Sequence, residues 1–412
     1  MKLLHVIRTL DPGWGGPIEG ARNISGQAKL NGVEAEIVCQ DNPDAGWLAN
    51  WRVPVHAIGS AKSTYGYDRR LDAWLRENVP RFDALVVHGI WMYFSLAAWK
   101  ATRRSRTPYY LFTHGMLDPW FKRMYPWKHL KKAVYWRLFQ HKVLRDAAAV
   151  LFTSEEERLL ADSAFLPYEC KPVVVGYGVA PPPRLQATRT REQLLQHITA
   201  SYPDLRNRKF ALFLGRIHEK KGIDLLLQAF ASEKDHGSNL ALVIAGPGNS
   251  DTVRRLRSLA ETLGVSDRTV WTGPLYGEAK WETMRAAEVF ALPSHQENFG
   301  ISIAEALACG TPVLISNKVN IWREIDHDGA GLVDSDDAEG TTRLLRRWSR
   351  LAPTEREVMG RNALRCFSTR FDMTTNCKRL FELVCRGRLG DAVSVTAGGI
   401  DLSGALHNDS GL

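Results

Sequence analysis

The chain has 412 residues, which is enough for two or three domains at the usual size of roughly 150 residues each. Hydrophobic residues make up 44% of the chain and charged residues 24%, and this composition excludes a wholly disordered or a fibrous protein. The formal net charge of +9 suggests an acidic partner, such as nucleic acid, an anionic membrane or a phosphorylated substrate, without choosing among them.

The first half of the chain alternates short apolar runs with amphipathic segments. The apolar runs predict strands at Leu3–Ile7, Glu36–Val38, Ala84–Val87, Tyr109–Phe112, Ala149–Phe152 and Pro172–Val175. Between them, segments such as Ala21–Leu30 and Leu71–Glu77 have the spacing of helices. Strands that alternate with helices predict a parallel sheet with crossover helices.

Three consecutive prolines at 181–183 interrupt this pattern and predict a linker, because proline fits neither a helix interior nor a central strand. The pattern then resumes, with strands predicted at Phe210–Leu214, Leu240–Ala245, Val289–Leu292 and Pro312–Ile315. We therefore expect an α/β protein with two Rossmann-like domains, residues 1–183 and 184–385, whose parallel sheets face each other across a cleft. Residues 386–412 are rich in glycine and lack periodicity, and we expect a disordered tail there.

The positive charge is concentrated in the first half. Residues 1–185 hold 25 Lys and Arg against 17 Asp and Glu, whereas the rest of the chain holds 29 against 28. The segment from Phe121 to Arg145 contains eight basic residues and no acidic one, and its apolar residues Trp127, Leu130, Val134 and Leu138 recur at helical spacing. We expect this apolar stripe to pack into the first domain, which is the usual fate of such a stripe. Contact with an anionic membrane is the alternative.

The cysteine pattern and the apolar runs indicate a cytosolic protein without a membrane span. None of the six cysteines forms a CxxC pair, which favours reduced thiols over zinc sites or a disulfide framework. The longest uncharged apolar stretch, Ala84 to Trp99, is shorter than the ~20 residues that a membrane helix needs. Membrane contact would then be peripheral, on the inner face of the plasma membrane.

Candidate binding residues follow the predicted strands, where parallel sheets bind their ligands. The first group, Gly13-Trp14-Gly15-Gly16, comes after the first strand and allows backbone N–H groups to approach an anion. A plain turn is an equally good interpretation. In the second group, Gly215 to Gly222, Arg216 and Lys221 can converge on phosphate oxygens, with a solvated basic turn as the alternative.

The third group is the most specific and runs from His295 to Ala306. It places Glu297 in a loop after a strand and Glu305 about one turn into the following helix. The start of that helix favours a diphosphate. A carboxylate one turn into the helix can accept hydrogen bonds from a ribose diol.

Together these motifs resemble glycosyltransferase family 4. The resemblance lies in Gly215-Arg216…Lys221-Gly222, Ala245-Gly246-Pro247-Gly248, the two glutamates eight residues apart at 297 and 305, and Gly310-Thr311-Pro312-Val313. The first half matches more loosely, through Gly15-Gly16, His88-Gly89 and Thr113-His114-Gly115. The family consists of retaining enzymes with the GT-B fold, two Rossmann-like domains around a cleft, so the resemblance implies a retaining, hexosyltransferase-type glycosyltransferase.

The resemblance also implies roles for individual residues. Arg216 and Lys221 would bind the donor diphosphate and stabilise the departing nucleotide, Glu305 would hold the ribose, Glu297 would contact donor-sugar hydroxyls, and His114 would lie near the reacting carbon. The expected catalytic set is therefore His114, Arg216, Lys221 and Glu297. The expected donor-binding set is Gly15, Gly16, Gly215, Arg216, Lys221, Gly246, Asn298, Phe299, Gly300, Ile301 and Glu305.

The resemblance also bears on cofactors and partners. It implies a UDP- or GDP-sugar donor without a metal ion, and a glycan or polyprenyl-linked acceptor in cell-surface polysaccharide synthesis. Asp334-Ser335-Asp336 has the D-x-D form of metal-dependent sugar transferases, but we interpret it as a solvated loop. Three alternatives remain: an inactive GT-B scaffold, another GT-B enzyme such as a sugar-nucleotide epimerase, and a basic nucleic-acid-binding protein. The last lacks a recognisable nucleic-acid-binding module, so we expect no nucleic-acid partner.

Overall fold

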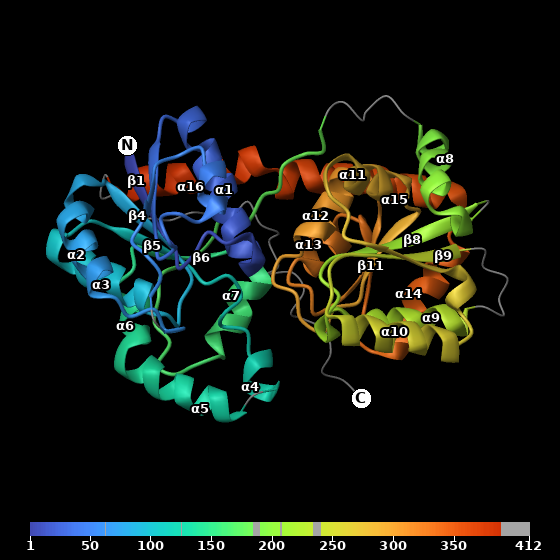
Figure 1. The fold of residues 1–412 in the computed structure, drawn as a ribbon, viewed down its shortest axis with the longest axis horizontal. Coiled ribbons are helices and arrows are strands. Elements are labelled where there is room, and N and C mark those ends of the chain that lie inside the picture. Colours follow the sequence, from blue (N-terminus) through green and yellow to red (C-terminus); the bar gives the residue numbers. More distant parts are fainter. Residues whose placement is uncertain (62, 125, 184–189, 207, 234–239, 389–412) are drawn as a thin grey trace, which may run out of the picture.

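The computed structural model describes residues 1–61, 63–124, 126–183, 190–206, 208–233 and 240–388. They form two α/β lobes, each built on one parallel sheet (Figure 1). The seven strands of the first sheet run in the order β3-β2-β1-β4-β5-β6-β7, and the six strands of the second run in the order β10-β9-β8-β11-β12-β13. The predicted α/β class with two parallel sheets is confirmed.

In the first lobe, strands that are mostly buried on both faces alternate with helices that cover them. The strands are β1 (Lys2–Val6), β2 (Glu34–Cys39), β3 (Val55–Ala57), β4 (Ala84–His88), β5 (Tyr109–Phe112), β6 (Ala149–Phe152) and β7 (Pro172–Val174). The helices are α1 (Gly16–Ala28), α2 (Arg69–Asn78), α3 (Tyr93–Ser105), α4 (Trp120–Met124), α5 (Pro126–Tyr135), α6 (His141–Arg145) and α7 (Glu155–Asp162).

The second lobe repeats the arrangement. Its strands are β8 (Lys209–Leu214), β9 (Leu240–Ala245), β10 (Thr269–Gly273), β11 (Val289–Leu292), β12 (Val313–Ser316) and β13 (Gly331–Asp334). Its helices are α8 (Arg191–Ser201), α9 (Ile223–Ser232), α10 (Ser250–Thr262), α11 (Gly277–Ala286), α12 (Ile301–Ala308), α13 (Trp322–His327), α14 (Ala338–Arg350) and α15 (Pro353–Cys366). Every strand predicted from the sequence is present, whereas the short strands β3, β10 and β13 were not predicted.

The final helix, α16 (Met373–Arg388), returns to the first lobe and lies beside α1 (Figure 1). Its apolar side chains, among them Leu380, Phe381 and Val384, share a core with Leu3 and Tyr110. The expected domain division assigned this helix to the second lobe, but the residues it buries belong to the first. Of the expected tail at 386–412, the first three residues complete α16, and the remainder lies outside the described residues.

The basic segment forms α4, α5, a π-helical turn at Trp136–Gln140 and α6. The expected packing of its apolar stripe is wrong, because Trp127, Leu130, Val134 and Leu138 are 81%, 59%, 57% and 54% exposed. The opposite face of the segment faces the lobe instead: His129, Lys132 and Ala133 are half-buried, and Trp136, Val143 and Leu144 reach the core. No helix within the described part of the chain is both long and apolar enough to cross a membrane.

Candidate active site in the cleft between the lobes

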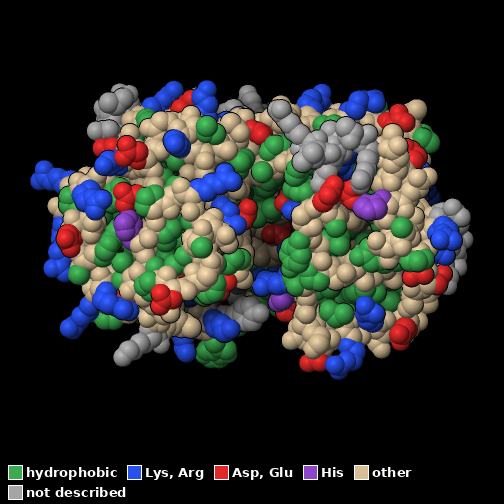
Figure 2. Space-filling view, turned by 45° about the horizontal axis from the view of Figure 1, so that its top comes forward, with side chains coloured by type: hydrophobic (Ala, Val, Ile, Leu, Met, Phe, Trp, Pro, Cys, Tyr) green, Lys and Arg blue, Asp and Glu red, His purple; other side chains and the backbone are tan. Residues whose placement is uncertain are grey.

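The two lobes meet with the carboxyl ends of their strands facing each other, and Figure 2 shows the molecule hollowed between them. Two side-chain hydrogen bonds and an ion pair are among the contacts that join the lobes here. Asn298 Nδ2 donates to Thr153 Oγ1 (3.2 Å), Gln296 Nε2 donates to Asp118 (3.1 Å), and Arg323 pairs with Glu156 (2.7 Å). The loop after β11 therefore lies directly opposite the loops after β5 and β6.

The glycine-rich turn after β1 leads straight into α1. The helix begins at Gly16, five residues earlier than the predicted Ala21. Gly15, at φ +80°, precedes it without a side-chain cap, and a Cβ atom at Gly15 or Gly16 would meet no other atom within 4 Å. Tyr177 Oη donates to the Gly16 carbonyl (2.7 Å) and holds the start of the helix in place. Within the turn, Trp14 N and Gly15 N already donate to the carbonyls of Asp11 (3.0 Å) and Pro12 (3.2 Å). Among the described residues the N–H group of Gly16 has no such partner, so it is the group of this turn that an anion could approach.

The loop after β8 supplies the predicted cations. Arg216 is exposed, and among the described residues it forms no ion pair or hydrogen bond. Burial lowers the pKa of the nearby His218, and the positive charge of Arg216 lowers it further. Lys221 pairs with Glu297. Gly246 packs directly on the backbone of Gly215, where a Cβ atom would lie 1.8 Å from the Gly215 carbonyl oxygen. The structure therefore gives Gly246 a packing role, and its donor contact stays a prediction.

The loop after β11 is held mainly by its backbone. Glu297 N donates to the Lys318 carbonyl (3.0 Å), and Asn320 N donates to the Glu297 carbonyl (3.0 Å). The Phe299 side chain is buried against Tyr177 and Phe371, with ring centroids 4.9 and 5.6 Å apart. Only the backbone of Phe299 is thus open to a ligand. The Asn298 side chain forms a hydrogen bond to the other lobe, and its expected contact with the donor stays a prediction.

Glu305 lies on α12 beneath Gly300 and Ile301, where the helix starts. It pairs with Lys280 of α11 at 2.6 Å, and its side chain is 13% exposed. Burial raises the pKa of Glu305, Lys280 opposes this rise, and Glu19 of α1 adds to it. Glu19 belongs to the other lobe, so the first turn of α1 and the predicted ribose-binding carboxylate face the same space.

His114 follows β5 with its backbone in the left-handed region, at φ +48°. Burial lowers the pKa of its imidazole to about 3, so the ring is neutral at physiological pH. Sequence reasoning missed the residue that holds this loop. Glu157 of α7 is 3% exposed and accepts hydrogen bonds from Gly115 N (2.6 Å) and from the hydroxyl groups of Thr113 (2.7 Å) and Thr153 (2.6 Å).

Glu157, Lys280 and Tyr177 are the functional residues that the sequence did not reveal. The pattern Ser154-x-x-Glu157 has the form of a helix start, so it gives no signal of long-range contacts.

Two other acidic groups near the cleft, Asp334 and Asp336, are paired. Asp334 ends β13 and pairs with Arg343 (2.7 Å), and Asp336 pairs with His295 (3.1 Å). In the part of the chain that the structure describes, no three or more His, Cys, Asp or Glu side chains are grouped to hold a metal ion.

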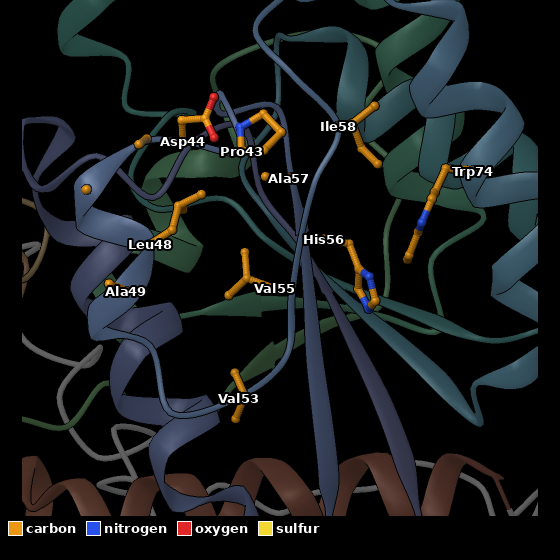
Figure 3. A pocket seen from close by; sticks show the side chains of 12 residues that line it. Pro43, Asp44, Leu48, Ala49, Val53, Val55, His56, Ala57, Ile58 and Trp74 are labelled. Carbon is orange, nitrogen blue, oxygen red and sulfur yellow. The ribbon is translucent and has the colours of Figure 1, made fainter.

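One pocket lies beside the cleft, and another lies on the outer edge of the first lobe. One of about 650 Å³ lies between α4 and the second lobe and is lined by Trp120, His218, Lys220 and His295, among others. The other, of about 840 Å³, lies over the outer strand β3 and is lined by Leu48, His56 and Trp74 (Figure 3). None of the predicted site residues lines the second pocket, so it is separate from the cleft.

Comparison with known proteins agrees with this arrangement. Residues 199–365 match the family model "Glycosyl transferases group 1", and residues 15–178 match "Glycosyl transferase 4-like domain". A D-inositol 3-phosphate glycosyltransferase of Saccharomonospora viridis is 38% identical over 159 residues, which cover 37% of this chain and 37% of that protein. The chain thus aligns with well under half the length of this relative.

Two solved structures share the fold over nearly their whole length. Anabaena HepE in complex with UDP and glucose superposes with a TM-score of 0.73 at 17% identity, covering 93% of this chain and 99% of that one. WaaG, described as a glycosyltransferase involved in lipopolysaccharide biosynthesis, superposes with a TM-score of 0.61 at 16% identity and the same coverage.

Proposed function

This chain belongs to the glycosyltransferase group 1 family (GT4) and has the GT-B fold, and from that premise we propose that it is a retaining hexosyltransferase using a nucleotide-diphosphate-sugar donor. One observation carries the proposal. Arg216, which forms no ion pair within the described residues, lies on the same side of the cleft as the ion pairs Lys221–Glu297 and Glu305–Lys280, opposite the start of α1. This is the charge distribution that a nucleoside diphosphate needs.

The proposed chemistry follows from where charge develops. As the bond between the anomeric carbon and the diphosphate breaks, negative charge grows on the leaving oxygen. Fixed cations and N–H groups lower the barrier when they lie where that charge appears. Arg216 and Lys221 would take this part without a metal ion, assisted by the backbone N–H group of Gly16 and by those at the start of α12.

The carboxylates would act by positioning. Glu305 would accept hydrogen bonds from the ribose hydroxyls, and Glu297 from hydroxyls of the donor sugar. Because Glu297 pairs with Lys221, we assign it no nucleophilic role. The acceptor would attack from the face that the diphosphate leaves, and the leaving phosphate would take the acceptor's proton, so that the anomeric configuration is retained.

The donor is proposed to be a UDP- or GDP-sugar, and the likeness to HepE, solved with UDP and glucose, supports UDP. A thermal-shift screen with UDP-, GDP- and ADP-sugars tests this directly. We expect one nucleotide to raise the melting temperature selectively. Stabilisation by none of them would contradict a nucleotide-sugar site, and binding without turnover would favour the inactive scaffold.

The acceptor is proposed to be a glycan on a polyprenyl phosphate, used in cell-surface polysaccharide synthesis by a cytoplasmic enzyme that binds the inner membrane surface peripherally. Lys122, Lys128 and Lys132 line one pocket with His129, and burial together with the charges of Lys122 and Lys132 lowers the pKa of His129. This concentration of positive charge supports a phosphate-bearing acceptor. The exposed apolar stripe beside it supports contact with an anionic bilayer.

Sedimentation with vesicles tests the membrane contact. We expect binding to vesicles that contain phosphatidylglycerol and little binding to pure phosphatidylcholine. Trp127→Glu should weaken the binding at least about tenfold, since it removes a large apolar side chain from the bilayer. Leu30→Glu is the matched control, because Leu30 is 80% exposed on the same lobe but lies outside the basic segment. Equal effects of the two variants would contradict the proposed surface.

A further inference from the structure

Three histidines lead from the interior of the first sheet to the cleft. His5 lies on β1, His88 ends β4 and His114 follows β5, and these three strands are neighbours in the sheet. His5 is 0% exposed and His88 is 2% exposed, whereas His114 is half-buried at the cleft. We call these three residues the histidine column. The donor chemistry proposed above uses only its last member.

The rings are joined edge to edge by hydrogen bonds. His5 Nδ1 lies 2.9 Å from His88 Nε2, and His88 Nδ1 lies 3.4 Å from His114 Nε2. The ring centroids are 5.2 and 5.6 Å apart, with interplanar angles of 27° and 15°. Each centroid separation exceeds the corresponding N–N distance by about the diameter of an imidazole ring. The bonded nitrogens therefore lie between the two centroids, as in an in-line hydrogen bond.

All three rings are neutral near pH 7, because burial lowers the pKa of His5 to about 4, that of His114 to about 3, and that of His88 well below its usual value. A neutral imidazole carries one N–H and one lone pair. Two hydrogen bonds in series then allow only two proton arrangements. Either every ring donates from Nδ1, towards the cleft, or every ring donates from Nε2, towards the interior.

The buried end of the column distinguishes the two arrangements. His5 Nε2 is buried, and no described residue forms a hydrogen bond with it. If the protons pointed inward, His5 Nε2 would carry an orphaned N–H group, which folded proteins rarely tolerate. If they point outward, it carries only an unused lone pair, which is less costly. The outward arrangement is therefore favoured.

We propose that His5 and His88 are positioning residues that fix His114 as the Nδ1–H tautomer, so that it presents a hydrogen-bond donor to the cleft. Nε2 of His114 is occupied by His88, and no described residue bonds its Nδ1, which is not among the buried atoms lacking a partner. Resting on the function proposed above, this assigns His114 a donor role towards a donor-sugar hydroxyl or the leaving oxygen. In this role His114 donates a hydrogen bond and does not act as a general base.

The tautomer can be measured without any substrate. Long-range nitrogen–proton correlation spectra of the full chain labelled with ¹⁵N-histidine show which ring nitrogen carries the proton, and His114→Gln identifies the signal of His114. We expect Nδ1–H in the wild type, and a change in that signal in His88→Leu. An Nε2–H signal for His114 in the wild type would overturn the proposal.

Turnover measurements on variants distinguish a positioning role of His88 from a packing role. His88→Leu should lower kcat about ten- to a hundredfold with little change in donor KM, less than the hundred- to thousandfold cost of deleting a donor outright. His88→Gln, whose amide can still donate to His114, should recover part of that loss. Phe112→Leu is the control, because Phe112 packs on both His88 and His114 without a hydrogen bond to either.

Each outcome bears on the proposal. If Phe112→Leu lowers kcat as much as His88→Leu, or if His88→Gln behaves like His88→Leu, the column acts by packing and the proposal fails. If the wild type turns over no sugar nucleotide while the spectra show Nδ1–H on His114, the proposed function fails but the tautomer assignment stands.

Discussion

Glu157→Gln is the most informative single substitution in this site. The Glu157 carboxylate is buried, and one of its oxygens serves the 113–115 loop while the other accepts from Thr153 N (2.7 Å) and Thr153 Oγ1 (2.6 Å). A glutamine keeps one oxygen and turns an amide NH₂ group towards the other donors. A hydroxyl group can rotate to accept from that amide, but a backbone N–H cannot.

The expected loss of unfolding free energy follows from the hydrogen bonds that glutamine cannot make. One orphaned buried N–H costs about 1–3 kcal/mol, and the remaining bonds lose the strength that the charged acceptor gave them, so we expect a loss of about 2–4 kcal/mol in total. That is a large part of a typical unfolding free energy of roughly 5–15 kcal/mol. Since the same carboxylate holds Gly115, the loop that carries His114 should loosen, and kcat should fall at least about tenfold.

Urea titration followed by circular dichroism measures the first effect, and release of nucleoside diphosphate measures the second. Glu155→Gln is the matched control, because it removes the same charge from the same helix at a half-exposed position where Glu155 pairs with Arg158, and it should cost less than about 1 kcal/mol. If Glu157→Gln stays within about 0.5 kcal/mol of that control, the carboxylate does not hold the loop as described.

Three other predictions follow from the site. Lys280→Met leaves Glu305 buried without its ion pair, so donor affinity measured by calorimetry should fall at least about tenfold while Lys209→Met, at the far end of β8, leaves it unchanged. Gly115→Ala forces a side chain into φ +72° with its Cβ atom 2.7 Å from Asn298 Cγ; it should cost about 1–3 kcal/mol, and an unchanged urea midpoint would contradict the close contact between the lobes. Because burial depresses each pKa in the histidine column, the unfolded chain binds more protons below pH 6.5. Stability is therefore complete above that pH and should fall by up to about 2 kcal/mol per histidine between pH 6.5 and 5; a flat urea midpoint over that range would refute this.

The sequence predicts the parts of the site that depend on local pattern. Apolar runs followed by loops mark the strand ends, and the candidate site residues in those loops, such as Arg216 and Glu297, are recognisable from their position after a strand. The structure brings these residues to one cleft because parallel strands all end on the same side of their sheet. The missed strands β3, β10 and β13 lie at or beside sheet edges and are only partly buried, so their residues lack the continuous apolar run of the central strands.

What could not be predicted depends on contacts between distant residues. The sequence pattern around Glu157 is that of an ordinary helix start, yet Glu157 accepts a hydrogen bond from Thr113, 44 positions away. The amphipathic pattern of α16 shows that it packs on something, but not that it crosses to the first lobe. The apolar stripe at Trp127 has the spacing of a buried stripe, and the sequence does not show that the face with His129, Lys132 and Ala133 is the one that packs on the lobe.

Turnover of a sugar nucleotide by the wild type and by Arg216→Ala and Glu305→Ala tests the central claim most directly. Circular dichroism first establishes that both variants fold. We then expect the wild type to release nucleoside diphosphate from one class of donor, UDP- or GDP-sugar, and Arg216→Ala to lower kcat about a hundredfold or more, because the cation that meets the leaving charge is gone. Glu305→Ala should chiefly raise the donor KM. Wild-type activity that neither substitution reduces would contradict this assignment of the site.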